Sequence, residues 1–94
     1  MINDKYNLKQ ALANHVARAA EKLRHQDSLC GEICVFINTN RFRKKDLQYN
    51  NSATLTFNDL TNNTTVIIQQ AFKLLESLYR PNYNYRKLEL YYLI

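Results

Sequence analysis

The spacing of the hydrophobic residues switches between two periods along this chain, and these switches constrain the fold more than any other feature. Steps of three and four residues indicate an amphipathic helix, whereas strict alternation indicates a strand with one buried face. The first apolar series has helical steps and consists of Leu8, Leu12, Val16, Ala19 and Leu23. We therefore predict a helix over residues 7–26, with Asn7 as its N-cap and Gln10 completing a capping box.

Four further segments follow this helix, and each has either the helical or the strand period. Alternation over residues 32–38 and 52–57 predicts two strands, and residues 58–64 between the second strand and the next element are rich in turn-forming types. A broad apolar stripe from Ile67 to Tyr79 predicts a second helix, which Pro81 ends. Residues 85–94 alternate again and predict a last strand. Its inward side chains are Leu88, Leu90 and Tyr92, and its outward ones are Lys87, Glu89 and Tyr91.

The order helix, strand, strand, helix, strand predicts an α+β fold. Two amphipathic helices on one face of an antiparallel sheet form a two-layer sandwich. The order matches the βαββαβ pattern of split-βαβ folds without its first strand. In that pattern the first strand lies between the third and the last, so we expect either a gap in the sheet or two free edges, through which the chain could form homo-oligomers. We interpret residues 1–94 as a single domain and a fragment of a longer protein.

The charged residues are unevenly distributed. The chain has 13 Lys and Arg against 8 Asp and Glu, a net charge of +5, which favours a polyanionic partner. Four of these cations lie in the run Arg41-Phe42-Arg43-Lys44-Lys45, between the first two predicted strands.

No apolar run is long enough to span a bilayer, so we expect no membrane partner. Cys30 and Cys34 would lie about 13 Å apart on an extended segment, too far for a disulfide, which favours reduced, structural thiols in the cytoplasm.

The polar face of the predicted sheet is the candidate binding surface. Hydroxyl and amide groups donate to phosphate oxygens, and Lys and Arg add charge, so such a face can hold a nucleic-acid backbone without reading its sequence. The candidate DNA-binding residues are Asn38, Arg41, Arg43, Lys44, Lys45, Asn51, Ser52, Thr54, Thr56, Lys87 and Tyr91. The alternative is an ordinary solvated loop and strand face. The pattern offers no catalytic residues and no metal ligands, because the acidic residues and the two histidines are too widely spread.

Several ordered segments resemble one family. The run from Ala11 to Arg24, ALANHVARAAEKLR, is similar to the first helix of the little-finger domain of Y-family DNA polymerases, in their UmuC-like branch. Val35-Phe36-Ile37-Asn38-Thr39 and Tyr49-Asn50-Asn51-Ser52-Ala53 resemble its second strand and the entry to its third. The helix from Thr65 to Leu78 and the Tyr85-Arg86-Lys87 triplet resemble its second helix and last strand. The family usually continues with a small residue, glycine and an aliphatic residue, where this chain has Leu88-Glu89-Leu90.

The resemblance implies a function in lesion bypass and SOS DNA repair in the bacterial cytoplasm. A little finger holds the primer–template duplex by its backbone, with its sheet near the major groove. The metal-binding carboxylates, and hence Mg²⁺, lie in the palm of the parent polymerase, so this fragment should hold no cofactor and have no polymerase activity alone. The implied partners are duplex DNA, the rest of the polymerase, a UmuD-like accessory subunit and the sliding clamp.

Two other classes of function remain open from the residues alone. A sheet-based RNA-binding module would need exposed aromatic side chains on adjacent strands. A protein-interaction module could dock through an open sheet edge or through Phe36, which the alternation places on the polar face. Single strands bound in preference to duplex would indicate the RNA-binding module, and binding that survives removal of the loop cations would indicate the protein-interaction module.

Overall fold

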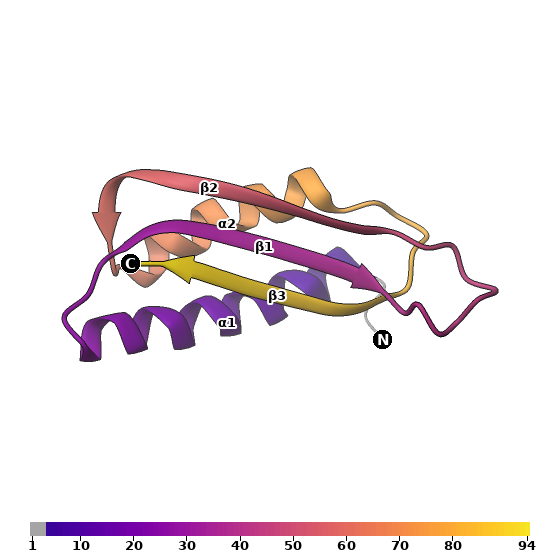
Figure 1. Ribbon diagram of the computed structural model, residues 1–94, viewed down its shortest axis with the longest axis horizontal. Coiled ribbons are helices and arrows are strands. Elements are labelled where there is room, and N and C mark those ends of the chain that lie inside the picture. The colour runs from indigo at the N-terminus through magenta and orange to yellow at the C-terminus, as the bar shows by residue number, and fades with distance from the viewer. Residues whose placement is uncertain (1–3) are drawn as a thin grey trace.

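A computed structural model describes residues 4–94 and contains two helices and three strands in the predicted order. These are helix α1 (Lys5–His25), strand β1 (Cys30–Thr39), strand β2 (Asn50–Thr61), helix α2 (Thr64–Leu78) and strand β3 (Tyr85–Leu93). The strands run along the long axis of a molecule that measures 46 × 21 × 20 Å, and both helices lie against the same face of the sheet (Figure 1). The predicted two-layer α+β sandwich is confirmed.

The sheet has the order β2-β1-β3, with antiparallel pairing on both sides of β1. The expected gap is therefore wrong for the described residues: β1 occupies the centre and joins the other two strands directly. The physical reason is that the backbone of β1 pairs along both of its edges, with β2 from Cys30 to Asn38 and with β3 from Glu32 to Thr39. Its Ile33, Val35 and Ile37 are 0–1% exposed and pack in the core at the centre of the sheet. The alternative expectation, two free edges, agrees with the three-stranded sheet formed within residues 4–94.

The core lies between the sheet and the two helices. All five residues of the helical series predicted for α1 are buried, and α2 adds Ile67, Ala71, Leu75 and Leu78. Full burial of one such aliphatic side chain contributes about 1.5–3 kcal/mol, so this layer holds the sheet flat against the helices. The inward residues of β3 are as predicted, with Leu88 buried and Leu90 and Tyr92 packed against the core.

The ends of the elements differ from the predictions in two places. Helix α1 begins earlier than predicted, because Asp4 and not Asn7 is its N-cap: the Asp4 carboxylate accepts a hydrogen bond from the Asn7 backbone N–H at 2.8 Å. Strand β2 continues to Thr61, through part of the segment predicted as a turn. Asn63 caps α2 by accepting a hydrogen bond from the Val66 backbone N–H at 3.1 Å.

Four tyrosines join the sheet to the end of α2. The rings of Tyr49, Tyr79, Tyr83 and Tyr85 pack with centroid distances of 5.1–6.4 Å. The Tyr85 side chain is fully buried, and its hydroxyl donates to the Arg80 carbonyl at 2.7 Å and accepts from the Arg80 backbone N–H at 2.9 Å. Burial raises the pKa of Tyr85. These contacts anchor the strand ends from which the loop between β1 and β2 projects.

Both cysteines are free thiols, as expected. Cys30 is buried in the core, which raises its pKa, whereas Cys34 is partly exposed on the face of the sheet away from the helices. Neither helix in the described part of the chain is long and apolar enough to cross a membrane.

Candidate nucleic-acid interface

The face of the sheet opposite the helices is uncovered by any other element of residues 4–94, and we call it the open face. Strand register arranges its side chains in four cross-strand rows. From the cationic loop outward, the rows are Asn50, Asn38 and Lys87; Ser52, Phe36 and Glu89; Thr54, Cys34 and Tyr91; and Thr56, Glu32 and Leu93. The structure thus brings together Asn38, Ser52, Thr54, Thr56, Lys87 and Tyr91, as the alternation predicted. Side chains directly opposite one another in such rows lie about 5 Å apart.

Asn51 does not lie on this face. Register pairs Asn51 with the core residue Ile37, so its side chain is on the helix side of β2, where its amide donates to the Tyr49 hydroxyl at 3.1 Å. Its neighbour Asn50 takes the open-face position beside Asn38. Asn51 is thus the one predicted strand residue that lies on the helix side, and the alternation through Ser52, Thr54 and Thr56 itself assigns Asn50 to the open face.

The loop between β1 and β2 is held in one conformation by side-chain hydrogen bonds. The Gln48 amide donates to three carbonyls of the loop, those of Asn40, Arg43 and Asp46, at 3.1–3.3 Å. The Asn40 side chain accepts from the Phe42 backbone N–H at 2.9 Å. Gln48 is in turn fixed by the Thr39 hydroxyl, which donates to it at 3.0 Å. The cations of the loop are therefore carried on an ordered turn at the end of the sheet.

The loop cations differ in how they are neutralised. Arg43 forms an ion pair with Asp46 at 3.2 Å, so part of its charge is satisfied within the chain. Arg41, Lys44 and Lys45 are exposed and form no ion pair with any residue between 4 and 94. On the open face, Lys87 is paired with Glu89 at 3.0 Å. The unneutralised positive charge is thus concentrated at the loop end of the sheet.

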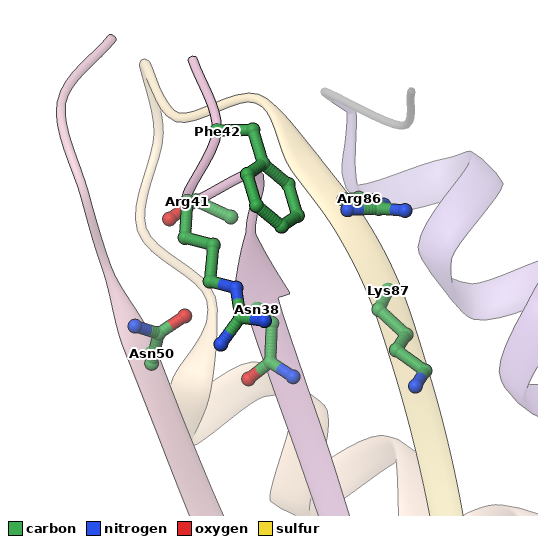
Figure 2. A pocket seen from close by; sticks show the side chains of 7 residues that line it. Asn38, Arg41, Phe42, Asn50, Arg86 and Lys87 are labelled. Carbon is green, nitrogen blue, oxygen red and sulfur yellow. The ribbon is translucent and has the colours of Figure 1, made fainter. Parts of the chain in front are cut away.

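A pocket of about 640 Å³ opens where the loop meets the sheet. Its lining includes Asn38, Asn50 and Lys87 from the first row, together with Arg41, Phe42 and Arg86 (Figure 2). Two guanidinium groups lie over the Phe42 ring, that of Arg41 at 4.9 Å and that of Arg86 at 5.7 Å from its centroid. Each distance is within the range of a cation–π contact, so the Phe42 ring is a common neighbour of both guanidinium groups.

Sequence analysis missed Arg86. Simple alternation would place it with Leu88 and Leu90, toward the helices. The register shifts between Asn38 and Thr39, whose partners are Lys87 and Tyr85, so Arg86 is an extra, bulged residue. A bulge redirects a side chain, and here it brings Arg86 into the pocket. A charged residue at the start of an otherwise inward-facing series was the one signal that could have revealed it.

Glu89 is the unusual charge on the open face. Its carboxylate accepts hydrogen bonds from the Tyr91 hydroxyl and from Lys87, and both hold the pKa of Glu89 below its ordinary value. The same contact with Glu89 raises the pKa of Tyr91. Glu89 is therefore ionised and Tyr91 is neutral at neutral pH. The middle of the open face carries a fixed negative charge, next to the positive loop end.

The remaining basic cluster, on α1, lies far from this surface in the fold. Arg18 and Lys22 are exposed on a helix that covers the opposite side of the sheet, and they form no ion pair in the described chain. Arg24 donates to the Asn62 carbonyl and the Thr64 hydroxyl at 2.8 and 3.0 Å, and so binds the start of α2. Within residues 4–94, no three His, Cys, Asp or Glu side chains group closely enough to hold a metal ion.

Comparison with known proteins identifies the class of domain. A family model described as the impB/mucB/samB family C-terminal domain matches residues 1–92, nearly the whole chain. The chain belongs to this family, and the predicted resemblance to the C-terminal domain of UmuC-like Y-family polymerases is confirmed.

Individual relatives agree with this assignment. The chain is 35% identical to Protein UmuC of Salmonella typhimurium over 86 residues, which are 92% of this chain and 20% of that protein. It is 38% identical to Protein MucB of Escherichia coli over 81 residues, 86% of this chain and 19% of that protein. It is 34% identical to Protein ImpB of Salmonella typhimurium over 86 residues, again 92% and 20%. The chain thus spans about a fifth of the length of these relatives.

Proposed function

We propose that this chain is the DNA-binding domain of a UmuC-like DNA polymerase that copies past lesions, and that it holds the sugar–phosphate backbone of the primer–template duplex. The observation that carries the proposal is the placement of Arg41, Lys44, Lys45 and Arg86, without ion-pair partners among residues 4–94, at one end of the open face. A cluster of one sign at the end of a flat polar surface attracts a polyanion and orients it. The family to which the chain belongs supports the same conclusion.

The charged and the hydroxyl side chains would make different contacts with the DNA backbone. The guanidinium and ammonium groups at the loop end neutralise phosphates, and Arg41 and Arg86 suit a phosphate best because each presents a planar fork of donors. The hydroxyls of Ser52, Thr54 and Thr56 on β2, all exposed, donate to further phosphate oxygens along the strand. None of these contacts reads a base pair, which suits a domain that must move along DNA of any sequence.

The chemistry of nucleotide transfer belongs to the rest of such a polymerase. Two metal ions held by carboxylates of a palm domain would supply it, whereas this chain would act by binding alone. A UmuD-like accessory subunit and the sliding clamp are further partners in this proposal, as is action in the SOS response within the bacterial cytoplasm.

Binding to a labelled duplex tests the proposal. Fluorescence anisotropy should show weak binding that does not depend on sequence and that weakens as salt rises. Replacing Arg41, Arg43, Lys44 and Lys45 by glutamine should abolish most of this affinity, since the loop supplies three of the four free cations at this end of the open face. The thermal unfolding curve should be unchanged, because none of the four side chains is buried.

A double variant on the opposite side of the molecule serves as the control. Arg18→Gln with Lys22→Gln removes two exposed charges from α1 and should leave DNA affinity nearly unchanged. If the loop variant binds duplex as tightly as the wild type, the proposal fails. A protein-interaction role would then be favoured, particularly if the loop variant still captured a protein partner.

A further inference from the structure

The middle of the open face differs in chemistry from the loop end, and it carries an aromatic pair. Phe36 on β1 and Tyr91 on the adjacent β3 pack edge to face, with ring centroids 5.6 Å apart. The two side chains are 36% and 54% exposed. Exposed aromatic rings on adjacent strands of a polar sheet are suited to stacking against unpaired bases.

Glu89 lies next to this aromatic pair, in the same cross-strand row as Phe36. A carboxylate repels phosphate, so the β3 side of the middle of the face is unsuited to a backbone contact. It is well suited to the edge of a base, because the exocyclic amino groups of cytosine and other bases donate to carboxylates. Lys87 and Tyr91 each occupy one acceptor site of Glu89, and an ionised carboxylate has about four. Two acceptor sites therefore remain for a ligand.

The pocket at the loop end completes the arrangement. The row of Phe36 and Glu89 is one step along the strands from the row of Asn38 and Lys87, which lines the pocket. One such step is about 7 Å, a span that a single nucleotide covers between its phosphate and its base. Arg41 and Arg86 in the pocket can hold the phosphate while the base reaches the aromatic pair.

We propose that the open face has a subsite for an unpaired nucleotide of single-stranded DNA, with its base stacked on the exposed Tyr91 ring beside Phe36, its amino edge bound by Glu89 and its phosphate in the pocket lined by Arg41 and Arg86. The subsite rests on the proposed function, since it assigns a single-stranded segment to the same DNA-binding surface. It distinguishes this surface from one that contacts only a duplex backbone. It also explains why a carboxylate lies at the centre of a surface built to attract DNA.

The test compares four probes on the 94-residue chain: a labelled duplex, a short oligo-dC, a short oligo-dT and a short oligo-rC. Tyr91→Leu removes a ring but keeps an apolar side chain, and it should lower affinity for oligo-dC by about tenfold. Duplex affinity should stay within about twofold of the wild type, because paired bases cannot stack on the ring. Tyr91→Phe is the matched control, since it keeps the ring and should retain most of the affinity for oligo-dC.

Glu89→Gln tests the base edge. The wild type should prefer oligo-dC to oligo-dT, because cytosine has an amino group for the carboxylate and thymine has none. The variant should bind both oligonucleotides more tightly, since a repulsive charge is removed, but the preference for oligo-dC should disappear. A preference that survives in Glu89→Gln would contradict the role of the carboxylate.

The outcomes separate this inference from the proposed function. If Tyr91→Leu leaves single-strand affinity unchanged, or lowers duplex affinity equally, the subsite is refuted, while salt-dependent duplex binding would leave the proposed function intact. If the wild type binds neither duplex nor single strands, both fail. Tighter binding of oligo-rC than of oligo-dC would overturn the assignment to DNA and favour RNA.

Discussion

The salt dependence of DNA binding should report how many cations at the loop end act on phosphates. Arg41, Lys44, Lys45 and Arg86 have no ion-pair partner among residues 4–94, whereas Arg43 and Lys87 are paired with carboxylates of the same chain. Each phosphate neutralised on B-DNA contributes about −0.9 to the slope of log affinity against log salt concentration. If the four free cations each neutralise one phosphate, the wild-type slope should be about −3.6.

Removing the two cations of the pocket should change this slope by a known amount. Arg41→Gln with Arg86→Gln leaves two free cations, so the slope should fall in magnitude to about −1.8. Both side chains are exposed, and their main contact is with the Phe42 ring, so the fold should be unaffected. The assay is anisotropy of a labelled duplex at several salt concentrations, with a thermal unfolding curve for each variant.

The matched control removes the same charge from α1. Arg18→Gln with Lys22→Gln lowers the net charge equally, but these side chains lie on the helix layer. The slope should therefore stay near −3.6, which is about −0.9 for each of the four free cations at the loop end. Equal slopes in the two double variants would refute the reasoning, because they would show that binding depends on total charge and not on the loop end. A wild-type slope near zero would refute it as well.

Three other predictions concern stability, accessibility and association. Tyr85→Phe removes two hydrogen bonds to the Arg80 backbone and should lower the free energy of unfolding by about 1–3 kcal/mol in chemical denaturation. Because the pKa of Tyr85 is raised on folding, its contribution to the free energy of unfolding should be complete below the ordinary tyrosine pKa of about 10 and should fall as pH rises above that value. Tyr85→Phe should not show this loss. Cys34 should react with iodoacetamide faster than the buried Cys30, and bound DNA should slow that reaction if it covers the open face, as mass spectrometry of the modified thiols would show. The outer edge of β2 is uncharged from Asn50 to Asn58, so the chain should self-associate in sedimentation velocity, and lysine at Thr54, an exposed position, should weaken the association.

The fold was largely predictable because each element has a clear hydrophobic period. The helix series from Leu8 to Leu23 and the aliphatic alternation over residues 33–37 required no tertiary information, and both lie in the core. The strand order was not predictable in the same way. Alternation specifies which face of a strand is buried but not which strand is its neighbour, and the split-βαβ pattern suggested a gap that pairing of β1 with β3 closes.

The candidate site was predictable where it depends on alternation and was missed where it depends on irregular backbone. Asn38, Ser52, Thr54 and Thr56 share a face because side chains alternate along regular strands. Arg86 enters the pocket only through a bulge, which shifts the alternation by one residue and leaves no clear mark in the sequence. The role of Gln48 in the loop was also missed, because it depends on three carbonyls that only the folded turn brings within reach of one amide.

The arrangement of charge along the open face constrains how DNA can lie on it. Unpaired cations gather at the loop end, while the centre carries the ionised Glu89. A phosphate backbone laid along the full length of β3 would have to pass over that carboxylate, which would cost affinity at low dielectric. A backbone that crosses the sheet at the loop end avoids the Glu89 carboxylate. The hydroxyls of β2 and the Phe36–Tyr91 pair can then contact the parts of the DNA that extend beyond that crossing. Glu89 therefore favours a bound strand that crosses the sheet, and so does Glu32, the other carboxylate of the open face, in the row farthest from the loop. Glu89→Lys should strengthen a lengthwise mode and give a steeper salt dependence.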